Sequence, residues 1–153
     1  MTIRYWDSDC FIAWFDQETG KFEKCKATVD KVTAGEIKLM VSAITLIEVI
    51  KLKNHNMLPK EKEDIIKAFF QNDFIKIVNV DRYIAEIARN LIWEFNVHPK
   101  DSIHVATAIF HKVPVLNTFD KDLIKLSEHI GGTPTLKICE PDIIVEPRLE
   151  FED

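Results

Sequence analysis

The stretch "YWDSDCFIAWF", residues 5–15, joins the end of an apolar run to the start of a helical pattern. The apolar run stops at Asp7, Ser8 and Asp9 follow, and hydrophobic side chains then return with helical spacing. One explanation is local, because Asp and Ser at a helix start commonly cap backbone N–H groups. The other is chemical, because binding sites of α/β proteins form at the carboxyl ends of strands.

Short apolar runs alternate with amphipathic stretches along the rest of the chain. We expect strands over residues 3–6, 37–42, 74–78 and 113–118, with a more weakly marked one over 135–139. We expect helices over residues 22–32, 46–53, 60–72, 81–96, 101–111 and 120–130, besides the one that begins near Ser8. The alternation predicts an α/β fold, a three-layer sandwich with a mainly parallel central sheet flanked by helices.

The chain has 153 residues, of which 46% are hydrophobic, and this favours one domain over residues 1–147 with an acidic tail over 148–153. No apolar run approaches the roughly 20 residues that a membrane helix needs, and no signal segment is visible, so no membrane partner is expected. Cys10, Cys25 and Cys139 show no metal-binding spacing. Reduced thiols and a cytoplasmic location are therefore expected.

The net charge of −5 is concentrated at the end of the sequence. Residues 140–153 carry six acids and one arginine, so the preceding 139 residues are balanced, with 19 basic and 19 acidic groups. Residues 20–62 hold nine lysines against five acids. A locally basic face for nucleic acid is compatible with this distribution, and so is a set of lysines that only solvate helices.

Four acids occur where strands give way to helices. Asp7 follows the first expected strand, Glu48 the second and Asp120 the fourth, while Asp101 opens a helix. Each has a local explanation. Thr45 and Glu48 fit a capping box, Asp101 would interact favourably with a helix dipole, and Asp120 would cap its helix.

Taken together, the four acids favour a shared site. In an alternating α/β chain these junctions converge on one edge of the sheet. Clustered carboxylates repel one another, and their pKa values rise unless a cation compensates. Carboxylates and water suit Mg²⁺ or Mn²⁺, which can activate water and neutralise charge on a phosphate. No nucleotide-binding loop, serine nucleophile motif or zinc spacing competes with this interpretation.

His104 lies one helical turn after Asp101. Residues three apart share a helix face, so His104 would support the carboxylates from behind or simply pack in the core. The sequence leaves both roles open.

The ordered set resembles the PIN-domain ribonucleases, particularly the VapC-like toxins of toxin–antitoxin pairs. Its parts are Asp-Ser after the first strand, Glu48 after the second, Asp101 before "IHVATA", and the late "TFDKD". The resemblance extends from Ile3 to about Pro147. It implies a metal-dependent endoribonuclease that uses Mg²⁺ or Mn²⁺, cleaves RNA, forms a homodimer and is silenced by a small antitoxin protein.

The resemblance also assigns roles to individual residues. Asp7 and Asp101 would be the principal metal ligands, and Glu48 and Asp120 would complete the catalytic quartet and position the attacking water. Three ancillary residues would support them through hydrogen bonds or an additional charge: Asp122, Thr118 and Ser8.

Two features depart from the family pattern or suggest other functions. Asp9 stands where relatives often have an uncharged residue, and it would cap the helix or add a fifth carboxylate. The Asp-x-Asp pair is also similar to haloacid-dehalogenase-type phosphatases, although Glu48 would then have no task and "TIRYW" is weakly apolar for a buried strand. A non-catalytic PIN-like module that binds RNA or protein is the remaining alternative.

Overall fold

The computed structural model describes residues 2–141, which form a five-stranded sheet in the order β3-β2-β1-β4-β5, with every neighbouring pair parallel. The strands are β1 (Thr2–Trp6), β2 (Ile37–Ser42), β3 (Ile75–Val78), β4 (Val115–Asn117) and β5 (Lys137–Cys139). The helices are α1 (Ser8–Phe15), α2 (Phe22–Thr33), α3 (Thr45–Glu48), η1 (Lys60–Lys62), α4 (Glu63–Phe70), α5 (Arg82–Phe95), α6 (Pro99–Phe110) and α7 (Lys121–Ile124).

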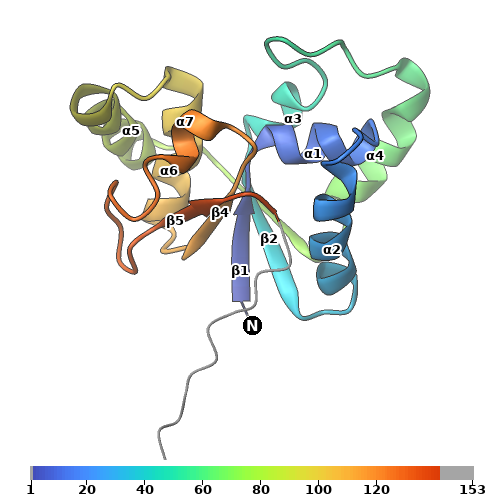
Figure 1. The fold of residues 1–153 in the computed structure, drawn as a ribbon, viewed down its shortest axis with the longest axis horizontal. Helices are drawn as coiled ribbons and strands as arrows, with labels where there is room; N and C mark the ends of the chain where they lie inside the picture. Colours follow the sequence, from blue (N-terminus) through green and yellow to red (C-terminus); the bar gives the residue numbers. More distant parts are fainter. Residues whose placement is uncertain (1, 142–153) are drawn as a thin grey trace, which may run out of the picture.

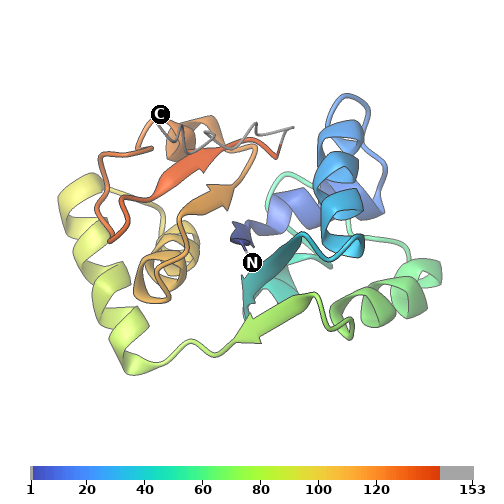
Figure 2. The ribbon, with the colours of Figure 1, turned by 90° about the horizontal axis from the view of Figure 1, so that it is seen from below.

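Helices cover both faces of this sheet. Alternate residues of a strand point to opposite faces, so Tyr5 belongs to the core beneath α5 and α6, whereas Trp6 belongs to the core beneath α1, α2 and α4. The two helical layers lie on either side of the strands in Figure 1, and Figure 2 shows the same separation from below. The expected α/β three-layer sandwich is confirmed, with a sheet that is parallel throughout.

The strand order reverses at β1, the central strand. The chain first builds outward through β2 to β3 and then returns to the other side of β1 for β4 and β5. Such a reversal leaves a crevice at the carboxyl ends of the two strands that flank it. Asp7 follows β1 and Thr118 follows β4, so both residues lie at this point.

Three local predictions are wrong. The helix expected over 46–53 ends at Glu48, and the helix expected over 120–130 ends at Ile124 in a series of turns. The stretch "TIRYW", described above as weakly apolar for a buried strand, forms the whole of the central strand, and even its Arg4 is only 3% exposed. The acidic tail over 148–153 lies outside the described residues.

Two further predictions concern membrane helices and the state of the cysteines. Over residues 2–141, none of the helices is both long and apolar enough to cross a membrane. All three cysteines are free thiols, with Cys10 and Cys25 buried and Cys139 partly exposed. Burial raises the pKa of Cys25 to about 12, so its thiol stays protonated and unreactive.

Candidate active site

Asp7 lies at the centre of the site and is only 6% exposed. It is the N-cap of α1, and its Oδ1 accepts a hydrogen bond of 2.8 Å from the Ser8 backbone N–H. Its Oδ2 accepts a second one of 2.8 Å from the Thr118 hydroxyl, which comes from the far side of the sheet reversal. The carboxylate is therefore fixed by two separate elements. The capping interpretation is correct for Asp7, but it accounts for one oxygen only.

Glu48 ends the short helix α3 and is 5% exposed. Its Oε1 accepts hydrogen bonds from the Ser8 hydroxyl at 2.9 Å and from Nε2 of His104 at 2.5 Å. Burial alone would raise the pKa of Glu48, but the hydrogen bond and charge of His104 outweigh it and lower the pKa. The capping box expected between Thr45 and Glu48 is wrong, because Glu48 bonds these partners and Ile44 is the N-cap.

Asp101 stands in the first turn of α6, after Pro99. Burial, followed by the nearby charges of Asp7 and Asp120, raises the pKa of Asp101 to about 7. The favourable helix dipole does not offset these effects. The protonated form of Asp101 is thus favoured far more than in an ordinary aspartate, and a neighbouring cation would disfavour it.

Asp120 directly precedes α7 and is half-buried. Its Oδ1 accepts hydrogen bonds from the backbone N–H groups of Asp122 and Leu123, so this residue is a true N-cap as well as a member of the acidic cluster. Asp122 is exposed, with a Lys125 amino group 3.8 Å from its Oδ1. Asp122 therefore adds charge at the edge of the cluster rather than in its interior.

Asp9 does not cap α1, which corrects the preferred interpretation of this residue. The N-cap is Asp7, and Asp9 turns toward the loop after β4, where its Oδ2 accepts a hydrogen bond of 3.0 Å from the Phe119 backbone N–H. Its Oδ1 is buried without a hydrogen-bond partner. Burial and the charge of Asp7 raise the pKa of Asp9 well above its ordinary value. Asp9 is thus a fifth carboxyl group of the cluster.

These acids line one cavity of about 490 Å³. It contains the carboxylates of Asp7, Asp9, Glu48, Asp101, Asp120 and Asp122. Within residues 2–141, no three His, Cys, Asp or Glu side chains are close enough to form a closed metal cage. Mg²⁺ usually keeps several waters and takes one or two carboxylates directly, so an open, acidic cavity of oxygen donors fits a hydrated hard cation.

Thr118 connects three acids and offers a direct test of this geometry. Its hydroxyl contacts Asp7 Oδ2 at 2.8 Å and Asp9 Oδ2 at 3.3 Å, and it accepts the Asp120 backbone N–H at 3.1 Å. The isosteric Thr118→Val change leaves a buried carboxylate oxygen without its donor. We expect the free energy of unfolding to fall by about 1–2 kcal/mol in a urea titration. Unchanged stability would show that these contacts are replaced by water.

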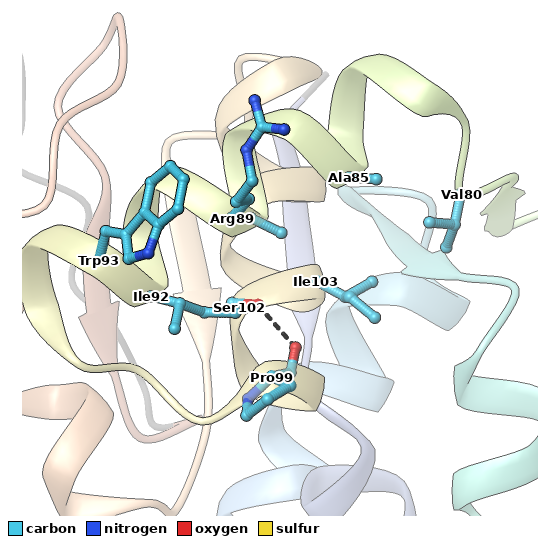
Figure 3. A pocket seen from close by; sticks show the side chains of 9 residues that line it. Val80, Ala85, Arg89, Ile92, Trp93, Pro99, Ser102 and Ile103 are labelled. Atoms are coloured by element: carbon cyan, nitrogen blue, oxygen red, sulfur yellow. Dashed lines mark hydrogen bonds between the residues drawn. The ribbon is translucent and has the colours of Figure 1, made fainter.

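A second cavity, of about 340 Å³, lies between α5 and α6 (Figure 3). It is mostly apolar, and Arg89 is the one charged residue among the described side chains that line it. Trp93, 76% exposed, lies beside it with its ring centroid 5.6 Å from the Arg89 guanidinium carbon. Its described lining residues include no acids, and the one hydroxyl, that of Ser102, donates to the Pro99 carbonyl oxygen, so this cavity does not suit hydrolysis.

Comparison with known proteins identifies the family. A PIN-domain family model matches residues 4–128, which include every one of the four acids. This chain belongs to the PIN-domain family. A search of curated proteins returns no significant match.

Solved structures share the PIN fold at low sequence identity. A toxin–antitoxin complex from Klebsiella pneumoniae is 23% identical, covering 78% of this chain and 89% of that one, with a TM-score of 0.59. The sarcin–ricin loop cleaving toxin VapC20 of Mycobacterium tuberculosis is 15% identical, with 78% and 91% coverage and a TM-score of 0.63. VapBC2 of Rickettsia felis, bound to a promoter DNA fragment, is 11% identical, with 90% and 98% coverage and a TM-score of 0.64.

The residues singled out from the sequence fall together in this PIN domain, and the hydrogen bonds expected of Ser8 and Thr118 are present. Sequence reasoning left His104 undecided and missed Tyr5, which contacts it. Two features of the sequence could have indicated the positions of His104 and Tyr5. The spacing of Asp101 and His104 places both on one helix face, and strand alternation directs Tyr5 toward α6.

Proposed function

We propose that this PIN domain is a metal-dependent endoribonuclease that hydrolyses RNA phosphodiester bonds with Mg²⁺ or Mn²⁺. One observation carries the proposal: Asp7, Glu48, Asp101 and Asp120, from four separate junctions, line a single cavity at the sheet reversal. Exposed Lys53 and Lys100 line the same cavity and would attract phosphates. The family assignment supports nuclease activity and disfavours the phosphatase interpretation.

The carboxylates have distinct tasks in this proposal. Asp7 and Asp101 would be the principal metal ligands, Glu48 and Asp120 would complete the set, and Asp122 would add charge nearby. A bound divalent ion would supply a more acidic water and neutralise charge developing on the phosphate. Ser8 and Thr118 keep Glu48 and Asp7 in fixed orientations through their hydroxyl groups. Glu48, whose pKa is lowered chiefly by His104, stays ionised and can orient a water for attack.

Calorimetric titration of metal-free protein with Mn²⁺, followed by incubation with total RNA, tests the proposal. We expect stoichiometric binding and RNA cleavage that EDTA abolishes and Mn²⁺ restores. Metal binding without cleavage would favour the alternative, a non-catalytic module that binds RNA or protein. Absence of binding would leave Asp7 and Asp120 as helix caps only and overturn the metal site.

The proposal extends to partners. Two of the similar structures are toxin–antitoxin assemblies, so we propose that this chain is the toxin of such a pair, bound by a small antitoxin protein. A homodimer and a cytoplasmic location belong to the same proposal. Light scattering on the purified chain would measure the oligomeric state directly. Co-purification with the product of an adjacent gene would test the antitoxin.

A further inference from the structure

A chain of buried hydrogen bonds runs beneath the acidic cavity from the sheet to Glu48. The Ser42 backbone N–H, at the end of β2, donates to the Tyr5 hydroxyl oxygen at 3.0 Å. The Tyr5 hydroxyl contacts Nδ1 of His104 at 2.6 Å, and Nε2 of His104 contacts Glu48 Oε1 at 2.5 Å. The three side chains come from β1, α6 and α3, which are distant in sequence.

Packing holds the His104 ring in one orientation. The ring is 1% exposed, and Tyr5, which is fully buried, contacts it edge-on with ring centroids 5.6 Å apart. The hydrogen bonds are all satisfied when the Tyr5 O–H donates to Nδ1 and the Nε2–H donates to Glu48. A ring fixed in this way directs its Nε2–H toward the cavity.

We propose that His104 is a positioning residue that orients the Glu48 carboxylate for the reaction, with Tyr5 fixing the histidine in turn. This inference rests on the proposed nuclease function. His104 and Ser8 both bond Oε1, which leaves Oε2 as the Glu48 oxygen without a donor among residues 2–141. His104 Nε2 also lies 3.6 Å from Asp7 Oδ1, so one N–H group separates two carboxylates.

The short helix α3 explains why Glu48 needs such support. It has four residues, and its outer side is open to solvent, with Ile47 74% exposed, although Thr45 and Glu48 on its inner side are buried. A helix of one turn restrains a long side chain only weakly, so hydrogen bonds from other elements are needed to hold the Glu48 carboxylate in one rotamer. Outer partners of this kind commonly change metal affinity and activity 10- to 100-fold when they are removed.

Three variants separate positioning from packing. His104→Leu keeps bulk without a donor, His104→Gln keeps an N–H donor, and Tyr5→Phe removes only the hydroxyl. Leu91→Ala is the matched control, since Leu91 lies on the buried face of α5 in the same core and its side chain takes no part in these hydrogen bonds. We expect His104→Leu to lose at least about 10-fold in Mn²⁺ affinity and to lower kcat more than it raises KM. His104→Gln should recover part of both losses, and Tyr5→Phe should show a smaller loss of the same kind.

A readout on the metal-free protein separates this inference from the nuclease proposal. In ¹H–¹⁵N spectra, the His104 Nε2–H should be protected from exchange, and its resonance should move in Glu48→Gln but not in the surface variant Glu63→Gln. This result would support the hydrogen-bond chain even if the protein binds no metal. An exchanging or unmoved proton would overturn the inference, as would a His104→Leu variant that loses stability like Leu91→Ala yet keeps wild-type Mn²⁺ affinity and kcat.

Discussion

The Asp7→Asn variant should lose metal-dependent RNA cleavage by about 10²- to 10³-fold, the scale expected when one key electrostatic group is removed from a site. Asp7 is nearly buried and is held by Ser8 and Thr118, so no other carboxylate can move into its place. The variant should still fold. Asn is as good an N-cap as Asp, and loss of one negative charge relieves the repulsion on Asp9 and Asp101.

The measurement compares initial rates of RNA cleavage at saturating Mn²⁺, together with calorimetric Mn²⁺ affinity. Asp73→Asn is the matched control. Asp73 is exposed in the turn before β3, so this variant has the same Asp-to-Asn substitution at a position outside the cavity. Asp101→Asn should behave like Asp7→Asn. Cleavage that survives in both variants would remove these carboxylates from the catalytic machinery.

The metal-free protein should become less stable as the pH rises from about 4 to about 7. The pKa of Asp101 in the folded protein is raised to about 7 by burial and by the charges of Asp7 and Asp120. A carboxyl group with a raised folded-state pKa contributes its stability below the unfolded pKa, and the contribution is lost as the pH passes the folded pKa. The raised pKa values of Asp9 and His104 act in the same direction. Glu48, whose pKa is lowered, loses its contribution only at more acid pH.

The size of this effect is limited by solvent around Asp101. The full shift corresponds to roughly 4 kcal/mol, and screening of a partly exposed group reduces it to about 2 kcal/mol. Urea titrations at pH 4.5, 6 and 8 in EDTA would measure it. Asp101→Asn should flatten the profile and exceed the wild type in stability at pH 8. A wild-type profile without slope over this range would contradict the repulsive cluster.

Addition of Mn²⁺ at pH 8 should reverse the loss. A cation that binds the folded state at 100 times its dissociation constant adds about 2.7 kcal/mol, which corresponds to a rise in Tm of roughly 5–10 °C for a chain of this size. The rise should be much smaller in Asp101→Asn. An equal rise in both proteins would place the ion elsewhere.

The sequence was sufficient to predict the layers and to bring the four acids to one edge of the sheet, where they line one cavity. Apolar runs at 37–42 and 74–78 have the composition of buried parallel strands, and the acids that follow such strands converge because all the carboxyl ends meet at one edge. Asp7 and Asp120 also cap helices, so the local explanation is correct for both residues, and capping does not prevent them from lining the acidic cavity.

The remaining differences arise from contacts between distant segments. The helix expected after Thr45 stops because Val49 turns into the core while Ile47 and Ile50 stay exposed, a tertiary effect that periodicity does not contain. Asp9 resembles a helix cap in sequence, but its partner is Phe119, 110 residues away. The role of His104 likewise depends on a tyrosine in β1 and a glutamate in α3.

The position of β1 at the reversal of the sheet has a consequence for protein synthesis. The strands β1, β2 and β3 and their helices supply Asp7 and Glu48, whereas the later half of the chain supplies Asp101 and Asp120. A ribosome that has made only the first half has produced two of the four carboxylates. If these four acids form the proposed nuclease site, hydrolysis requires that Asp120 has left the exit tunnel and that β4 has joined β1. Under the proposed function, the nascent chain would leave the RNA around it intact until that late stage of synthesis.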